Sequence, residues 1–333
     1  MNESARLHGR VAPRGPRASV QLNGIEGHSP PVVPPEQTSR PLGLLVLRSV
    51  RDFAQSGQPA VSSIAFVVGC PIVRGRYHIP RMAFPILGLH HVTATADDAQ
   101  ADLDFGLDAL GLRLVKKTVN FDNRGVYHFY YGDERGTPGT LWTTFPYKLL
   151  GVPQGIKGAG QVTVTSFSVP AGSLDSWKTR LRARGLSVTD APPRFGEESV
   201  VVADPSGLLI ELVATTADTR TPWLANDIDA ATAVRGIHSV TMTVGDPAPT
   251  LAFMREWFGF GPSEEMDGRT RVSVNGVGPG KSIDILTSPD GVPARNGVGT
   301  VHHVALAIAE SSEQAQLREA LIKSGIKVTA IID

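Results

Sequence analysis

Four segments of the chain share one pattern of hydrophobic and polar positions. Each segment starts with a strand-like alternation, continues through a helix start signal and an amphipathic helix, and returns to strand after a glycine. The initial strands start near residues 90, 162, 238 and 302, at roughly equal intervals. Because self-similarity at a fixed spacing is the signature of repeated structural units, the pattern predicts four copies of one module.

Residues typical of helix ends mark the helix of each module. The predicted starts carry capping residues, namely Asp97 and Asp98, Ser173, Asp246 before Pro247, and Ser311 with Ser312. The predicted ends carry glycine, at positions 111, 185, 259 and 325. Glycine is favoured there because it tolerates the left-handed conformation that commonly follows a helix.

Further strand signals follow the helices of the first three modules. They cover residues 126–131 and 140–145, 199–203 and 208–213, and 270–274 and 282–286. With the strand that resumes after each glycine, each module is one strand, one helix and three strands, a βαβββ unit. Such a unit exposes one apolar sheet face and must pair with another to bury it.

The sequence therefore predicts an α+β protein in which tandem βαβββ modules pair into two open barrels. The modules are expected at residues 83–150, 151–232, 233–296 and 297–333. The fourth stops at Asp333, after its helix and the start of a strand at 326–328, so we expect it to be truncated, without its last two strands. The resulting unpaired edge and exposed apolar face would favour aggregation, homo-oligomerisation and poor solubility.

Residues 1–82 differ from the rest of the chain. They are rich in Pro, Arg, Ser and Gly and show no sustained period. Segments of this composition cannot bury enough apolar surface to fold alone, so we expect a largely disordered N-terminal extension. The short apolar run at 42–50 is the exception, with the character of a stray helix or strand.

Composition narrows the classes of function. The 333 residues suffice for two compact domains, and Lys+Arg 32 balances Asp+Glu 32. This balance gives no excess positive charge to recommend nucleic acid or an anionic membrane as a partner. The single cysteine, Cys70, excludes an internal disulfide framework, and no apolar run approaches the roughly 20 residues that span a bilayer. We expect a cytoplasmic protein.

Two pairs of adjacent histidines stand out among the nine in the chain: His90 with His91, and His302 with His303. Neighbouring side chains of a strand point to opposite faces, so one histidine of each pair is expected to face an interior. Two strands brought together by module pairing would then offer two imidazoles to one metal ion. The alternative is two strand starts with structurally hydrogen-bonded rings.

Several longer sequence segments resemble those of the vicinal oxygen chelate superfamily, which includes glyoxalase I, fosfomycin resistance proteins and type I extradiol dioxygenases. Within it, the chain is most similar to the hydroquinone-type ring-cleaving dioxygenases. The likeness covers about residues 86–333. The phrases that carry it are residues 88–93, 110–122, 127–133, 235–241 and 299–305.

The resemblance implies a site and a cofactor. Modules one and four would share a metal barrel and modules two and three a supporting one, with His91 and His303 as ligands of Fe(II), or of Mn(II) or another divalent metal. His90 and His302 would orient these ligands or act as acid–base groups, and Thr93 would approach the site. The family's third ligand, a glutamate, would fall beyond the end of this sequence.

The expected function is extradiol-type cleavage of a hydroquinone- or catechol-like ring by Fe(II) and O₂. The small aromatic substrate and O₂ are the expected partners. Without the carboxylate ligand, we expect the chain as written to be inactive or weakened. Two alternatives stay open: a glyoxalase-like metal-dependent lyase or isomerase, and a non-catalytic small-molecule-binding module of the same fold.

Other polar residues have mainly structural interpretations. Glu211 lies where a module's ligand glutamate would lie, and we expect it to be a vestige or a polar group at the barrel mouth. His238 lies one residue off the His91 position, and we expect a hydrogen-bonded structural ring, with pairing to Glu211 in a second, degenerate site as the alternative. His128 is expected at the core edge or facing solvent. Lys116 and Lys117 are expected at a solvated strand end, with attraction of an anionic substrate as the alternative. Residues 275–282 resemble a phosphate loop but are expected to form a hairpin turn.

Overall fold

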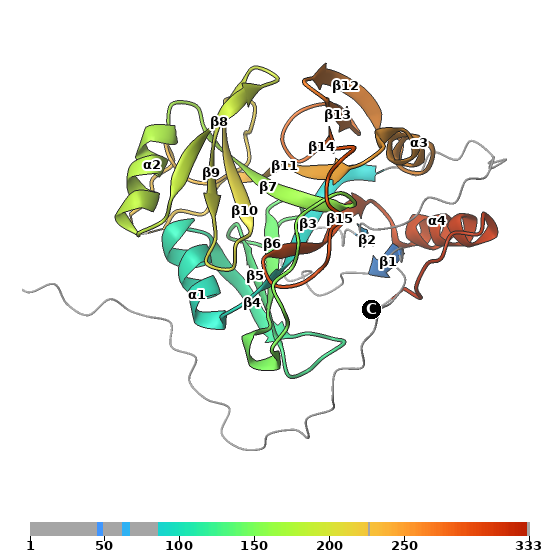
Figure 1. The fold of residues 1–333 in the computed structure, drawn as a ribbon, viewed down its shortest axis with the longest axis horizontal. Helices are drawn as coiled ribbons and strands as arrows, with labels where there is room; N and C mark the ends of the chain where they lie inside the picture. The colour runs from blue at the N-terminus through green and yellow to red at the C-terminus, as the bar shows by residue number, and fades with distance from the viewer. Residues whose placement is uncertain (1–44, 49–61, 67–85, 226, 332–333) are drawn as a thin grey trace, which may run out of the picture.

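A computed structural model describes residues 45–48, 62–66, 86–225 and 227–331 of the chain. It is an α+β structure of two curled sheets with a few short helices on their outer faces (Figure 1). Within these residues, no helix has the length and apolar character needed to cross a bilayer.

The first sheet combines modules one and four. Its strand order is β1-β2-β15-β3-β6-β5-β4. The strands are β1 (Leu45–Arg48), β2 (Ser62–Phe66), β3 (Ile86–Ala96), β4 (Arg113–Val119), β5 (Tyr127–Gly132), β6 (Leu141–Pro146) and β15 (Thr300–Ile308). The associated helices are α1 (Ala99–Asp104), a π-helical turn (Phe105–Ala109), a 3-10 turn (Lys148–Leu150) and α4 (Ser311–Lys323).

The second sheet combines modules two and three, in the order β12-β13-β14-β11-β7-β10-β9-β8. Its strands are β7 (Gln161–Pro170), β8 (Val188–Arg194), β9 (Glu197–Ala203), β10 (Leu209–Thr215), β11 (Gly236–Val244), β12 (Gly261–Met266), β13 (Arg269–Ser273) and β14 (Ser282–Thr287). Its helices are α2 (Leu174–Ala183) and α3 (Pro247–Phe258).

The modules pair as the sequence predicts. The first strands of paired modules run antiparallel, β3 with β15 and β7 with β11. Within each complete module the first and last strands run parallel, as in β3 with β6 and β7 with β10. Modules one and four therefore share one open barrel, and modules two and three share the other.

The N-cap positions agree with the sequence at three helix starts and differ at the fourth. The side chains of Asp98 and Asp246 accept hydrogen bonds from the backbone N–H groups of the first turns of α1 and α3. Ser173 is the N-cap of α2, but its Oγ donates to the carbonyl of Pro170 instead. The N-cap of α4 is Glu310, one residue before the predicted serines, because Glu313 reaches back to form a capping box.

The free edge of β15 is covered, contrary to the unpaired edge that we expected from the sequence. The backbone of β2 pairs with β15 in antiparallel register from Val304 opposite Phe66 to Ile308 opposite Ser62, and β1 pairs with β2. The strand predicted at 326–328 does not form among the described residues. The other residues of the expected N-terminal extension lie outside the described ranges, so the structure does not test their expected disorder.

A ring of backbone hydrogen bonds joins the two sheets near the paired histidines. The loops before β6 and β14 each reach across to the opposite sheet through one glycine. The bonds run from Gly139 N to His90 O (2.8 Å), Ile237 N to Gly139 O (2.8 Å), Gly280 N to His238 O (2.8 Å) and Leu89 N to Gly280 O (2.7 Å). The side chains of Trp142 and Phe167 extend the contact between the sheets, with ring centroids 6.4 Å apart.

Candidate metal centre

Two β-bulges position the paired histidines. Along the β3–β15 ladder, Val301 lies opposite Ala94 and His303 opposite Thr93, so the strand register skips His302; a second register shift skips His90. A bulge leaves one extra residue unpaired and re-aims the side chains beside it. Each pair of adjacent histidines therefore departs from the strict strand alternation that we assumed from the sequence.

All four imidazoles form one cluster as a result. His90 Nδ1 lies 2.9 Å from His91 Nδ1, and His302 Nδ1 lies 2.8 Å from His303 Nδ1. The His91 and His303 rings meet edge to face with centroids 5.2 Å apart. Burial lowers the pKa of His90 to about 4, so that its ring is neutral at pH 7.

The two predicted ligands converge at the centre of this cluster. His91 Nε2 and His303 Nε2 lie 3.1 Å apart, although the residues are 212 positions apart in the chain. Two adjacent nitrogen ligands of one ion, at bond lengths of about 2.1 Å and a right angle, lie about 3 Å from each other. The donor pair therefore fits a single metal ion. Thr93 Oγ1 lies 3.0 Å from His303 Nε2, beside the same point.

A complete set of protein ligands is not present among the described residues. Within them, no group of three or more His, Cys, Asp or Glu side chains is placed to hold a metal ion. The histidine pair would supply two ligands of the two-His, one-carboxylate set that is typical of non-haem iron.

Polar residues continue from the histidines across the concave face of the first sheet. Thr143 on β6 lies opposite Thr93, with their Oγ1 atoms 2.8 Å apart. His128 Nε2 lies 3.0 Å from Thr143 Oγ1, and His128 Nδ1 lies 2.9 Å from the hydroxyl of Tyr130. His128 is buried, which agrees with core-edge packing and excludes the solvent-facing alternative. The sequence analysis missed Thr143, because only the strand register reveals its neighbours.

The second barrel holds a buried network of ion pairs at the corresponding place. Glu211 is buried and paired with the guanidinium of Arg194, which also contacts Asp284 at 3.1 Å. Burial pushes the pKa of Glu211 upward, but the hydrogen bonds and charge of Arg194 outweigh it, so this pKa lies below its usual value. Glu211 is therefore the ion-pair partner of the Arg194 guanidinium inside the barrel and does not lie at the barrel mouth.

His238 has a structural environment, as the sequence indicates. It lies at a bulge in β11 that matches the position of His90. Its Nε2 lies 2.9 Å from Glu197 Oε1 and its Nδ1 lies 3.0 Å from Ser239 Oγ. It does not pair with Glu211, and serine rather than histidine follows it in the chain.

The glycine-rich loop follows its structural interpretation, whereas the two lysines lie in the middle of the edge strand β4 rather than at a strand end. The ammonium groups of Lys116 and Lys117 lie over the rings of Tyr130 and Tyr127, 5.8 and 5.2 Å from the centroids. Residues 274–281 connect β13 to β14, which pair antiparallel, so this segment is a hairpin connection and no helix follows it.

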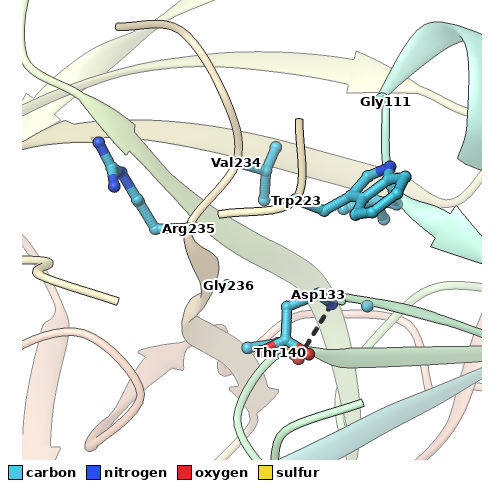
Figure 2. Close-up of a pocket in the computed structure, with 9 residues that line it drawn as sticks. Gly111, Asp133, Thr140, Trp223, Val234, Arg235 and Gly236 are labelled. Atoms are coloured by element: carbon cyan, nitrogen blue, oxygen red, sulfur yellow. Dashed lines mark hydrogen bonds between the residues drawn. The ribbon is translucent and has the colours of Figure 1, made fainter. Parts of the chain in front are cut away.

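A shallow hollow lies between the first module and the start of β11 (Figure 2). None of the predicted site residues lines it, so it is separate from the histidine cluster. Its lining residues are Gly111, Leu112, Gly132, Asp133, Thr140, Trp223, Val234, Arg235 and Gly236.

Comparison with known sequences gives a consistent assignment. The profile of the Glyoxalase/Bleomycin resistance protein/Dioxygenase superfamily matches residues 88–212 and 236–333. MhqE of Bacillus subtilis (strain 168), which carries the name of a ring-cleaving dioxygenase, is 39% identical over 248 residues, 74% of this chain and 79% of that protein. The chlorohydroquinone/hydroquinone 1,2-dioxygenase of Sphingobium indicum is 36% identical over 236 residues, 69% of this chain and 73% of that protein.

Solved structures agree with this assignment. A Bacillus subtilis crystal structure that carries the name of a dioxygenase superposes with a TM-score of 0.62 at 36% identity, covering 67% of this chain and 70% of that one. Glyoxalase I from Zea mays superposes with a TM-score of 0.51 at 16% identity, covering 72% and 80% of the two chains. The latter likeness concerns the fold alone.

Proposed function

Since the chain belongs to the glyoxalase/bleomycin resistance protein/dioxygenase superfamily, we propose that it is a ring-cleaving dioxygenase for a hydroquinone- or catechol-like substrate. The observation that carries the proposal is the convergence of His91 Nε2 and His303 Nε2 from the first strands of two different modules. A relative named for ring cleavage, at 39% identity, and one named a hydroquinone 1,2-dioxygenase, at 36% identity, support the reaction class.

His91 and His303 would hold the metal, for which we propose Fe(II), with Mn(II) or another divalent ion as the alternative. Imidazole nitrogen suits these first-row ions, and two histidines leave several positions for other ligands. When bound, such a metal supplies coordination of a phenolate oxygen and activation of O₂.

The residues around the ligand pair would orient its two rings and contact the substrate. His90 and His302 contact the Nδ1 atoms of His91 and His303, and such contacts fix the ring orientation of a ligand histidine. Burial lowers the pKa of His90 to about 4, so its neutral ring is a weak base and would orient His91 rather than take up a proton. Thr93, beside His303 Nε2, would contact the substrate side of the site.

Oxygen uptake tests the proposal. The chain is loaded anaerobically with Fe(II) and mixed with hydroquinone or catechol in aerated buffer, while O₂ and the ring-opened product are followed together. We expect stoichiometric O₂ uptake by the wild type and loss of at least 100-fold in His303→Ala, since losing a ligand exceeds the roughly 10–100-fold cost of losing a neighbour of a ligand. His238→Gln, at the matching bulge of the second barrel, is the control and keeps the wild-type rate.

Other outcomes would favour the alternatives. Conversion of a substrate without O₂ uptake would point to lyase or isomerase chemistry. Tight binding of the aromatic compound without turnover by the loaded chain would point to a binding module. Ring cleavage at the wild-type rate by His303→Ala would contradict the assignment of the site.

A further inference from the structure

The polar residues on the concave face of the first sheet form an unbroken chain of hydrogen-bonding contacts that starts at the histidine cluster. It runs from His303 Nε2 to Thr93 Oγ1 (3.0 Å), to Thr143 Oγ1 (2.8 Å), to His128 Nε2 (3.0 Å), and from His128 Nδ1 to the hydroxyl of Tyr130 (2.9 Å). Every separation lies within hydrogen-bonding distance.

Strand register explains why these residues touch. Thr93 on β3 lies opposite Thr143 on β6, and Thr143 lies opposite Tyr130 on β5. His128 is two residues before Tyr130 and therefore shares its face of the sheet. This chain of contacts thus crosses the sheet perpendicular to its strands. Strands β3 and β6 each contribute one residue to it, and β5 contributes two.

The chain connects a buried region with a partly exposed one. The side chains of Thr93, Thr143 and His128 are buried. Tyr130 is only partly buried, and so is Lys116 on the edge strand β4, whose ammonium lies over the Tyr130 ring. Tyr130 is therefore the end at which the chain can exchange protons with water.

The chemistry of each member permits proton transfer in either direction. A hydroxyl can donate and accept at once, and a neutral imidazole has one donor and one acceptor nitrogen. Because His128 uses both nitrogens, a proton that enters at one nitrogen and leaves at the other converts one tautomer into the other. A proton can thus pass along the chain without leaving a net charge on the sheet face.

The second barrel shows that the fold does not require such a chain. By register, Thr241, Asp284 and Arg271 occupy the positions of Thr93, Thr143 and Tyr130. Asp284 there is a fixed partner of Arg271, with a 2.7 Å contact between Oδ1 and Nε. An ion pair of this kind holds its protons, whereas the first barrel has only hydroxyl groups in those places.

We propose that Thr93, Thr143, His128 and Tyr130 form a proton relay between the metal centre and solvent. The inference rests on the proposed function, because binding of a phenol as phenolate releases one proton inside the barrel. That proton passes to the hydroxyl of Thr93 as Thr93 gives its own to Thr143. Thr143 then protonates one nitrogen of His128, the other nitrogen releases its proton to Tyr130, and Tyr130 passes one to water.

The first arm of the test uses the metal-free chain with ¹⁵N-labelled histidine. If the relay exists, the His128 ring populates both neutral tautomers in exchange, and the ring nitrogens show averaged shifts by NMR. Tyr130→Phe and Thr143→Val, each of which removes one partner of His128, are expected to collapse this average to a single tautomer. A wild-type ring fixed in one tautomer would overturn the relay, because a purely structural hydrogen bond needs only one.

The second arm measures proton release in the metal-loaded chain without O₂. 4-Nitrocatechol changes absorbance when it ionises, so stopped flow reports how fast the bound probe loses its proton. We expect Tyr130→Phe to slow this step about 100-fold, the usual order for loss of a positioned proton carrier, with unchanged metal affinity. Tyr127→Phe is the matched control, since Tyr127 lies on the same strand under Lys117 but outside the chain of contacts.

The two arms separate failure of the relay from failure of the proposed function. Equal rates of probe ionisation in Tyr130→Phe, Tyr127→Phe and the wild type would overturn the relay while leaving the dioxygenase assignment intact. If the wild type takes up no metal, the proposed function fails, and the tautomer of His128 in the metal-free chain decides the relay alone.

Discussion

At the scale of single residues, one carboxylate is buried between α1 and the first sheet. Asp102 on α1 accepts hydrogen bonds from the hydroxyls of Tyr131 and Thr144, on the face opposite the histidine cluster. Its other oxygen, Oδ1, has no partner among the described residues. Burial raises the pKa of Asp102 to about 7, because the charged form loses its hydration.

This shift predicts a pH dependence of folding stability. The folded chain binds the Asp102 proton up to about pH 7, whereas the unfolded chain releases it near the ordinary aspartate pKa of 3.8. The free energy of unfolding should therefore fall as the pH rises from about 4 to 7. Asp102→Asn has no such titration, so its free energy of unfolding should not fall for this reason. Urea unfolding should therefore show the stability of the variant rising relative to that of the wild type between about pH 4 and 7. An identical pH profile for both proteins would contradict the shift.

The Arg194–Glu211 pair is a second test at this scale. Removing one partner of a buried ion pair leaves an uncompensated charge and typically costs about 3–5 kcal/mol. We expect Glu211→Gln to lower the free energy of unfolding by this amount in denaturant titrations. Asp190→Asn, which removes an exposed partner of Lys178, is the control and should cost no more than about 1 kcal/mol. Equal losses of unfolding free energy in both variants would contradict a stabilising role for the buried Arg194–Glu211 pair.

The residues that the sequence could identify carry a signal in their own segment, whereas those that it could not identify depend on partners far away in the sequence. His91 and His303 were found because each lies in a recognisable strand phrase of its own module. Thr143 and Arg194 carry no local signal. Their importance comes from partners on neighbouring strands, and Arg194 lies next to a register irregularity in β8 that alternation alone does not predict.

At the scale of secondary-structure elements, bulges rather than regular alternation shape the site. The sequence predicted the strands that carry the histidines, and they form as β3 and β15. It placed the two members of each histidine pair on opposite faces. The bulges at His90 and His302 bring both members into one cluster instead. Bulge positions depend on the pairing of two distant strands, which a single strand phrase does not encode.

The pairing of β2 with β15 predicts a role for the N-terminal residues in solubility. An exposed strand edge is a template for pairing with another chain. Removing residues 1–66 deletes β1 and β2 and frees the β15 edge. Size-exclusion chromatography over a concentration series should then show self-association. Removing residues 1–40 leaves both strands and is the control; if the two truncated chains behave alike, β2 does not protect the edge.

At the scale of the whole molecule, the two barrels share one architecture but hold different chemistry. Both are built on an antiparallel pair of first strands, β3 with β15 and β7 with β11. The first contains imidazoles and hydroxyls, and the second contains Arg194, Arg271 and their carboxylates. The repeat and the family resemblance together predicted this pairing of modules. The ion pairs of the second barrel arise from contacts between strands and were not predicted.

The claim on which the account depends is that the first barrel binds one metal ion between His91 and His303. Anaerobic titration with Co(II), followed by its visible absorption bands, measures this directly. We predict one ion per chain in the wild type and in His238→Gln, and loss of at least 100-fold in affinity in both His91→Ala and His303→Ala. Wild-type affinity in either alanine variant, or no uptake by the wild type, would contradict the account.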